Sequence, residues 1–154
     1  MWYEWVETYN SFISNRDKEG ASMIKLTVSN GTNELANEAG VQIKGNKDAG
    51  LANGLSPREL LEAAIALCTS ITLEAVLKRD GVEYNADEVH VQVVASKEEG
   101  VKNRFTHFQV DVTLPSGLDE AYVEKLLKVV ERGCTISNTV SKGAAVTLNA
   151  KSHA

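Results

Sequence analysis

The chain has 154 residues, 43% of them hydrophobic and 24% charged, a composition typical of one soluble globular domain rather than of a disordered or fibrous protein. Its net charge of −5 disfavours a nucleic-acid-binding protein, which needs a basic surface to neutralise phosphates. We therefore expect no nucleic-acid partner.

Residues 1–22 are predicted to form an extension, an amphipathic helix followed by a linker. Acidic residues, Glu4 and Glu7, occur where a signal peptide would carry basic ones, so we expect a cytoplasmic protein. Two roles stay open for the helix: docking on its own domain or on a partner, and lying on a membrane surface, which its acidic face disfavours. Its apolar residues recur at helical spacing and are Trp2, Trp5, Val6, Tyr9, Phe12 and Ile13.

Residues 23–154 are predicted to form the main domain, which opens with two or three antiparallel strands between residues 24 and 44. Apolar and polar residues alternate there, and Asn30-Gly31 is typical of a tight hairpin turn. The loop at 45–54 is rich in glycine but lacks the residue order of a phosphate-binding loop. We expect no cofactor.

The longest apolar segment, residues 56–80, is predicted to be a central, buried helix. Ser56 can cap its first turn, and Glu59, three residues later, completes a capping box. Apolar residues cover more than one stripe of its surface, which is typical of a helix inside a core. Polar residues interrupt the segment, so we expect no membrane span. Cys68 lies at its middle, where burial is expected to raise the pKa of the thiol.

Two alternating segments, residues 82–96 and 104–114, predict a pair of antiparallel strands joined by a polar turn. His90 and His107 fall on their polar faces. Since no set of His, Cys or carboxylate residues converges at a ligand spacing, we expect no metal site.

A helix is predicted from residue 118 or 119 to 132, followed by a short helix that Cys134 opens and by a last strand at 145–150. A thiol at a helix N-terminus interacts with the positive end of the helix dipole, which lowers its pKa. For either cysteine alone, a small buried apolar residue remains the alternative.

The segments GLSPRELLEAAIALCTSITLEAVLKRDGV and RGCTISNTV resemble the OsmC-like family, which includes the organic hydroperoxide resistance proteins. The resemblance covers about residues 23–150. It implies an α+β fold with antiparallel sheets around a central buried helix, in an intertwined homodimer. It further implies that Cys68 reacts with an organic hydroperoxide, that Cys134 resolves the sulfenic acid as a disulfide, and that a dithiol reductant restores both thiols. Glu59 matches the glutamate of the family's site.

Two departures from the family pattern leave two functions open. Peroxidases of the family place an arginine from the N-terminal strands beside the reactive thiol, but no arginine occurs here between Asp17 and Pro57. Glu59 also precedes Cys68 by about two and a half helical turns, so the two residues lie on opposite sides of a straight helix. The chain is therefore either a peroxidase or a non-catalytic redox-sensing or small-molecule-binding protein. The lysines that could replace the arginine as point charges are Lys25, Lys44 and Lys47.

Overall fold

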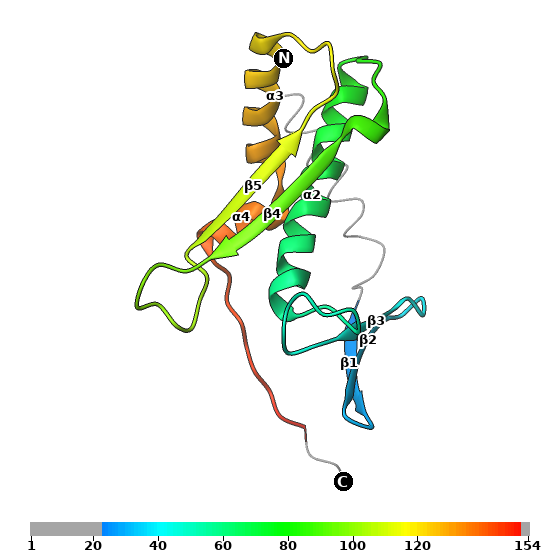
Figure 1. The fold of residues 1–154 in the computed structure, drawn as a ribbon, viewed down its shortest axis with the longest axis vertical. Coiled ribbons are helices and arrows are strands. Elements are labelled where there is room, and N and C mark those ends of the chain that lie inside the picture. The colour runs from blue at the N-terminus through cyan, green and yellow to red at the C-terminus, as the bar shows by residue number, and fades with distance from the viewer. Residues whose placement is uncertain (1–22, 152–154) are drawn as a thin grey trace. The chain divides into compact units, whose positions relative to one another are not determined.

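The computed structural model describes residues 23–151, so the predicted extension at residues 1–22 lies outside the described part. The described chain falls into two compact units, one that ends at Leu61 and one that begins at Glu62 (Figure 1). Helix α2 starts in the first unit and continues into the second. The elements are β1 (Ile24–Ser29), β2 (Thr32–Asn37), β3 (Gln42–Gly45), α2 (Pro57–Arg79), the 3₁₀ turn η1 (Ala86–Glu88), β4 (His90–Ser96), β5 (His107–Thr113), α3 (Glu120–Gly133) and α4 (Thr135–Lys142).

The first unit holds an antiparallel sheet in the order β1-β2-β3, as the alternating pattern predicted. Asn30 and Gly31 turn the chain between β1 and β2 with φ angles of 50° and 75°, the left-handed conformation that a two-residue hairpin turn requires. In the register, Leu26 of β1 faces Leu35 of β2, which in turn faces Ile43 of β3. An apolar row thus crosses all three strands on one face.

The start of α2 is held by the predicted capping box. The backbone N–H of Glu59 donates to Ser56 Oγ at 3.2 Å, and the N–H of Ser56 donates to Glu59 Oε2 at 2.7 Å. The other carboxylate oxygen, Oε1, accepts the N–H of Gly50 at 2.9 Å. One side chain therefore ties the preceding loop to the first turn of the helix, and the predicted capping box is confirmed.

Helix α2 is buried on one face only. Its buried residues include Leu73 and Leu77, both 0% exposed, whereas Leu67 is 64% exposed and Ile71 is 37% exposed. The predicted central helix is therefore buried along one face in the single chain, and part of its apolar surface stays exposed. By length and composition α2 could cross a membrane, a test that core helices of soluble proteins also pass. Its packed face is that of a core helix.

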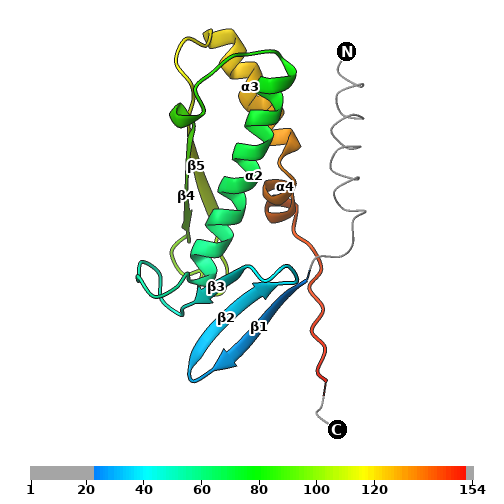
Figure 2. The same cartoon turned by 90° about the vertical axis from the view of Figure 1, so that its right-hand side faces the viewer.

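In the second unit, β4 and β5 pair in antiparallel register with their apolar residues turned toward the helices. Along β4, Val91, Val93 and Ala95 are the less exposed positions, which confirms the predicted alternation. The sheet runs along one side of α2, and α3 and α4 lie along another (Figure 2). A carboxylate oxygen of Glu62 on α2 accepts the N–H of Ala95 at 2.8 Å, which fixes the helix against the sheet.

The residues after α4 form no strand, so the strand predicted at 145–150 is wrong. Residues 144–151 are irregular, and Val146 and Leu148 are 94% and 96% exposed. Alternation alone does not make a strand, because each strand needs a neighbour that pairs with its backbone groups. None of the five described strands lies beside this tail in the register of either sheet.

Candidate functional site: two thiols at the helix junction

Cys134 lies at the junction of α3 and α4, where the two helices share it as a cap. Its backbone N–H donates to the carbonyl of Val130 and closes α3, while its carbonyl accepts the N–H of Asn138 in α4. The residue is buried, with 1% of its surface exposed. The predicted placement of a cysteine at a helix N-terminus is confirmed.

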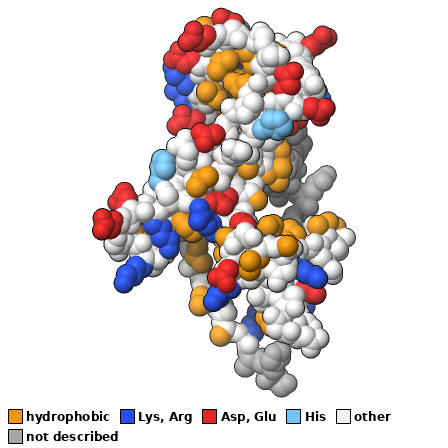
Figure 3. Space-filling model, viewed as in Figure 1, with side chains coloured by type: hydrophobic (Ala, Val, Ile, Leu, Met, Phe, Trp, Pro, Cys, Tyr) orange, Lys and Arg blue, Asp and Glu red, His pale blue; other side chains and the backbone are white. Residues whose placement is uncertain are grey.

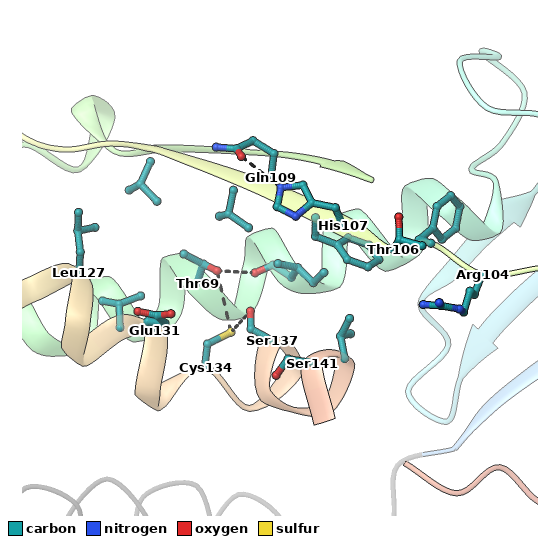
Figure 4. A pocket seen from close by; sticks show the side chains of 17 residues that line it. Thr69, Arg104, Thr106, His107, Gln109, Leu127, Glu131, Cys134, Ser137 and Ser141 are labelled. Atoms are coloured by element: carbon teal, nitrogen blue, oxygen red, sulfur yellow. Dashed lines mark hydrogen bonds between the residues drawn. The ribbon is translucent and has the colours of Figure 1, made fainter. Parts of the chain in front are cut away.

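Ser137 is the main hydrogen-bond donor to the Cys134 sulfur. Its hydroxyl donates to Sγ at 3.1 Å. Thr69 Oγ1 lies farther away, at 4.0 Å, and directs its own proton to the carbonyl of Ile65 at 2.8 Å. In Figure 4 the sulfur points between the labelled Thr69 and Ser137 side chains. The site therefore presents one good donor and one distant hydroxyl to this sulfur.

The surroundings of Cys134 favour its thiolate. Burial acts to raise the pKa, but the side chain and the backbone N–H of Ser137, together with the neighbouring Cys68 and Thr69 side chains, lower the pKa of Cys134 on balance. This direction agrees with the effect predicted for a thiol at a helix N-terminus.

Cys68 is partly buried in the middle of α2, near enough to Cys134 for each thiol to affect the pKa of the other. Burial raises the pKa of Cys68, and the neighbouring Cys134 raises it further, while the backbone N–H groups of Ile136 and Thr135 oppose these effects. The raised pKa predicted for this thiol is confirmed. The structure thus brings together two cysteines that are 66 positions apart, both as free thiols.

A cavity of about 720 Å³ opens beside Cys134 in the second unit (Figure 4). Apolar side chains of α2, α3 and β5 form much of its wall, and Arg104, His107 and Glu131 are its charged or titratable residues. Cys68 is not among the described side chains that line it. The full lining is Ile65, Thr69, Arg104, Phe105, Thr106, His107, Phe108, Gln109, Val110, Val112, Leu127, Val130, Glu131, Cys134, Ser137, Val140 and Ser141.

Glu59, the third predicted site residue, lies in the first unit, where both of its carboxylate oxygens accept backbone N–H groups. Hydrogen bonds from Ser56 and Gly50 lower the pKa of this carboxyl group below its usual range. These contacts give Glu59 a structural role at the helix start, and its catalytic role stays a prediction.

The described histidines, His90 and His107, are exposed and lie at opposite ends of the β4–β5 pair, since His90 is opposite Thr113 and His107 is opposite Ser96. Figure 3 shows histidine side chains as separate pale-blue patches. Among residues 23–151, no three His, Cys, Asp or Glu side chains gather in a way that could hold a metal ion.

Two residues near the Cys134 site were not predicted from the sequence, Ser137 and Arg104. Ser137 could have been found, because it follows Cys134 by three residues, the spacing at which a side chain in the first helical turn reaches back to the cap. Arg104 gave no such signal, since it comes from the loop between β4 and β5 and reaches the cavity through tertiary structure alone.

The chain is an α+β protein with two antiparallel sheets, a long core helix and two neighbouring free thiols. A family model described as OsmC-like protein matches residues 47–149. The chain therefore belongs to the OsmC-like family, which confirms the resemblance seen in the sequence.

Solved structures agree with this assignment. An OsmC-like protein from Mycoplasma pneumoniae aligns with a TM-score of 0.61 at 15% identity, covering 80% of this chain and 89% of that one. The organic hydroperoxide resistance protein OhrB of Bacillus subtilis gives a TM-score of 0.51 at 22% identity, with 79% and 90% covered. An organic hydroperoxide resistance protein OsmC from Legionella pneumophila gives 0.57 at 16%, again with 79% and 90% covered. At these identities the likeness shows the fold. No curated protein matches the chain.

Proposed function

We propose that this protein is a thiol-dependent peroxidase that reduces organic hydroperoxides through a Cys68–Cys134 disulfide. The observation that carries the proposal is the proximity of the two free thiols: Thr69, the residue next to Cys68 on α2, has its hydroxyl 4.0 Å from the Cys134 sulfur, and each thiol affects the pKa of the other. Membership of the OsmC-like family supports a redox or hydroperoxide-resistance role. Two relatives of similar fold are named for organic hydroperoxide resistance, which favours the same substrate class here.

The reaction needs one thiolate and one neighbouring thiol. The thiolate attacks an oxygen of the peroxide, the O–O bond breaks, and the sulfur becomes a sulfenic acid while an alcohol leaves. The second thiol then displaces water from the sulfenic sulfur and forms the disulfide. An external dithiol returns two electrons and restores both cysteines. The family resemblance assigns the first attack to Cys68, but the overall reaction is the same for either order.

We further propose that the protein works as a cytoplasmic homodimer. The exposed apolar face of α2, with Leu67 and Ile71, and the exposed apolar residues of β1 support this assembly. Light scattering at micromolar concentration is the test: a mass near twice 16.7 kDa is expected, and a folded species of 16.7 kDa contradicts it.

The proposed activity is tested by hydroperoxide consumption with dithiothreitol as the reductant. The wild-type protein should consume organic hydroperoxide catalytically, and stoichiometric peroxide should remove two hydrogens per chain in the intact mass. The double variant Cys68→Ser/Cys134→Ser is the matched control and should consume none. Survival of both thiols in the folded protein under excess hydroperoxide contradicts the proposal.

A second candidate is a non-catalytic redox-sensing or small-molecule-binding protein of the same fold. The cavity of about 720 Å³ and the lack of arginine between residues 17 and 57 favour it. The same experiment separates the two, because a sensor forms its disulfide once and does not turn over with excess dithiol and peroxide.

A further inference from the structure

We propose that Ser137 positions Cys134 for the second step of the reaction: its hydroxyl holds the Cys134 sulfur as a thiolate, which then attacks the oxidised Cys68. This role rests on the proposed peroxidase function, in the order that the family resemblance implies, with Cys68 attacking the hydroperoxide and Cys134 forming the disulfide. Ser137 is a positioning residue in this step, since it acts through the sulfur of Cys134 and not on the peroxide.

The Ser137 hydroxyl differs from the other hydroxyls of its helix in what it binds. Ser and Thr side chains within helices commonly donate to a backbone carbonyl of the preceding turn. Thr139, also on α4, does so, with its hydroxyl 2.8 Å from the carbonyl oxygen of Thr135. Ser137 instead donates to Cys134 Sγ at 3.1 Å. Its proton therefore stabilises the sulfur and not the helix backbone.

Thr69 is the other hydroxyl beside the sulfur, and it lies too far away to replace Ser137. Its Oγ1 is 4.0 Å from Cys134 Sγ and donates its proton to the carbonyl of Ile65 at 2.8 Å. In Figure 4 the two hydroxyls approach the sulfur from different helices, Thr69 from α2 and Ser137 from α4. Cys134 is 1% exposed, so water has little access to the sulfur. Loss of the Ser137 hydroxyl should therefore leave the sulfur without its close donor.

The hydrogen bond from Ser137 favours the thiolate form of Cys134, because a donor stabilises a negative sulfur more than a neutral one. Burial raises the pKa of Cys134, but the Ser137 side chain is foremost among the groups that lower it, and the net direction is downward. The thiolate is the nucleophilic form of a thiol. A lowered pKa therefore increases the fraction of Cys134 that is ready to react at neutral pH.

Other charged or titratable groups lie around Cys134. Cys68 is on α2 and Glu131 is on α3, while Arg104 precedes β5 and His107 begins it. These groups titrate in the wild-type protein and in variants of Ser137 alike. The ratio of variant rate to wild-type rate at each pH therefore isolates the contribution of the Ser137 hydroxyl.

The second step forms an S–S bond and breaks an S–O bond. Once Cys68 is a sulfenic acid, the Cys134 thiolate donates an electron pair to the Cys68 sulfur. The sulfenic oxygen leaves as hydroxide and takes a proton from solvent to become water. Cys134 is oxidised as the Cys68 sulfur is reduced, so the step needs no outside oxidant or reductant. The negative charge leaves the Cys134 sulfur as the new bond forms, and the hydrogen bond from Ser137 weakens.

A hydrogen bond that stabilises a thiolate has two opposite effects on its rate of attack. Below the pKa of the thiol, each unit by which the pKa falls raises the thiolate fraction about tenfold, while the nucleophilicity of the thiolate falls about threefold. The net result is an attack about threefold faster below the pKa and about threefold slower above it. Ser137→Ala should therefore react more slowly than the wild-type protein at neutral pH, and faster once the pH exceeds the pKa of Cys134 in both proteins.

Single-turnover kinetics test this reversal. Reduced wild-type protein and Ser137→Ala, with folding verified by circular dichroism, are mixed with cumene hydroperoxide at a concentration that makes the first step the faster one, and are quenched with acid at successive times. Intact mass separates the two steps, because the sulfenic acid adds one oxygen and the disulfide removes two hydrogens. We expect Ser137→Ala not to slow the first step, and to slow the second about threefold at neutral pH for each unit of pKa.

Two control variants separate the hydroxyl from the fold. Thr139→Ala removes a hydroxyl from the same helix, outside the cavity, and should follow the wild-type rates at every pH. Ser137→Thr keeps the hydroxyl and should restore the wild-type pH profile. A Ser137→Ala variant that slows the second step equally at every pH contradicts the proposed role, since a purely structural residue acts in that way. A Ser137→Thr variant that behaves as Ser137→Ala also contradicts it.

A titration without peroxide tests the hydrogen bond itself. In the Cys68→Ser background, the ultraviolet absorbance of the thiolate reports the pKa of Cys134, and adding Ser137→Ala should raise it. An unchanged pKa overturns the role of Ser137, even where the wild-type protein forms its disulfide with hydroperoxide. If hydroperoxide oxidises neither thiol of the wild-type protein, the proposed function itself fails. The two failures are therefore distinguishable.

Discussion

The two sheets carry similar alternating patterns but use them differently. In β4, the apolar face turns toward the helices, and Ala95 is only 3% exposed. In β1, every residue is exposed, including Leu26 at 52% and Val28 at 66%. An alternating pattern thus predicts that one face of a sheet is apolar and packs against something. It does not predict whether the packing partner belongs to the same chain.

The difference shows which of the two sheets is packed against helices of its own chain. The β4–β5 sheet has its own helices, so substitutions on its inner face act on the stability of one chain. The apolar row of Leu26, Leu35 and Ile43 crosses the other sheet and remains accessible at both outer strands. Substitutions in that row should act through assembly instead.

The largest effect is expected from a charge on the inner face of the covered sheet. Ala95→Asp buries a carboxylate beside the Glu62 carboxylate that accepts the Ala95 N–H. We expect a loss of about 3 kcal/mol or more in the free energy of unfolding, measured by urea denaturation. Val94→Asp, on the exposed face of the same strand, is the control and should lose less than about 1 kcal/mol. Similar losses for the two variants would show that the inner face is not covered as described.

A charge on the uncovered sheet should break assembly rather than folding. Leu26→Asp interrupts the apolar row of β1, so we expect the dissociation constant of the proposed homodimer to rise at least tenfold, or about 1.4 kcal/mol, while circular dichroism stays unchanged. Sedimentation velocity is the measurement. Thr27→Asp, the next residue along β1, is the matched control. An unaltered dimer in Leu26→Asp would place the interface elsewhere.

A smaller effect is expected at the loop that leads from the first sheet into α2. Ser56→Ala removes the hydroxyl that caps the helix, and such losses cost about 1 kcal/mol. Chemical denaturation should detect this, with Ser29→Ala at the exposed end of β1 as the control. A loss no greater than in the control would mean that the capping box adds nothing to stability.

The smallest effect concerns acid. The folded state lowers the pKa of Glu59 below 4.5, so this carboxylate contributes stability above its unfolded pKa, and the contribution is lost as pH falls through the folded pKa. The wild-type protein should therefore lose more stability between neutral pH and about pH 3 than Glu59→Gln does. Glu99→Gln, in the exposed loop after β4, should follow the wild-type curve. Parallel curves for all three proteins would contradict the role of Glu59.

Local patterns predicted most elements. Features that depend only on residues close in the sequence can be predicted from it. Examples are the capping box of Ser56 and Glu59 and the turn at Asn30-Gly31. The helix boundaries at Asp119 and Cys134 follow from caps in the same way. The strand at 145–150 was wrong because a strand also needs a neighbour, which no local pattern supplies.

The site was predicted in part. The pairing of Cys68 with Cys134 came from the resemblance to a family, since their 66-residue separation alone says nothing of contact. The sequence also directed attention to the missing arginine before Pro57, whereas the structure brings Arg104 to the cavity from a loop. Contacts of this kind depend on how β5 packs against α3 and α4, and such packing is not encoded in residue spacing.

The outer position of β1 has a consequence for handling the protein. In the order β1-β2-β3, one side of β1 presents backbone N–H and C=O groups that no described strand pairs. An open edge with alternating Ile24, Leu26 and Val28 is a template for adding foreign strands, the first step of aggregation. If the homodimer covers this edge, the edge is exposed when the dimer dissociates. Samples diluted below the dissociation constant of the dimer should therefore aggregate at a lower temperature than samples kept above it.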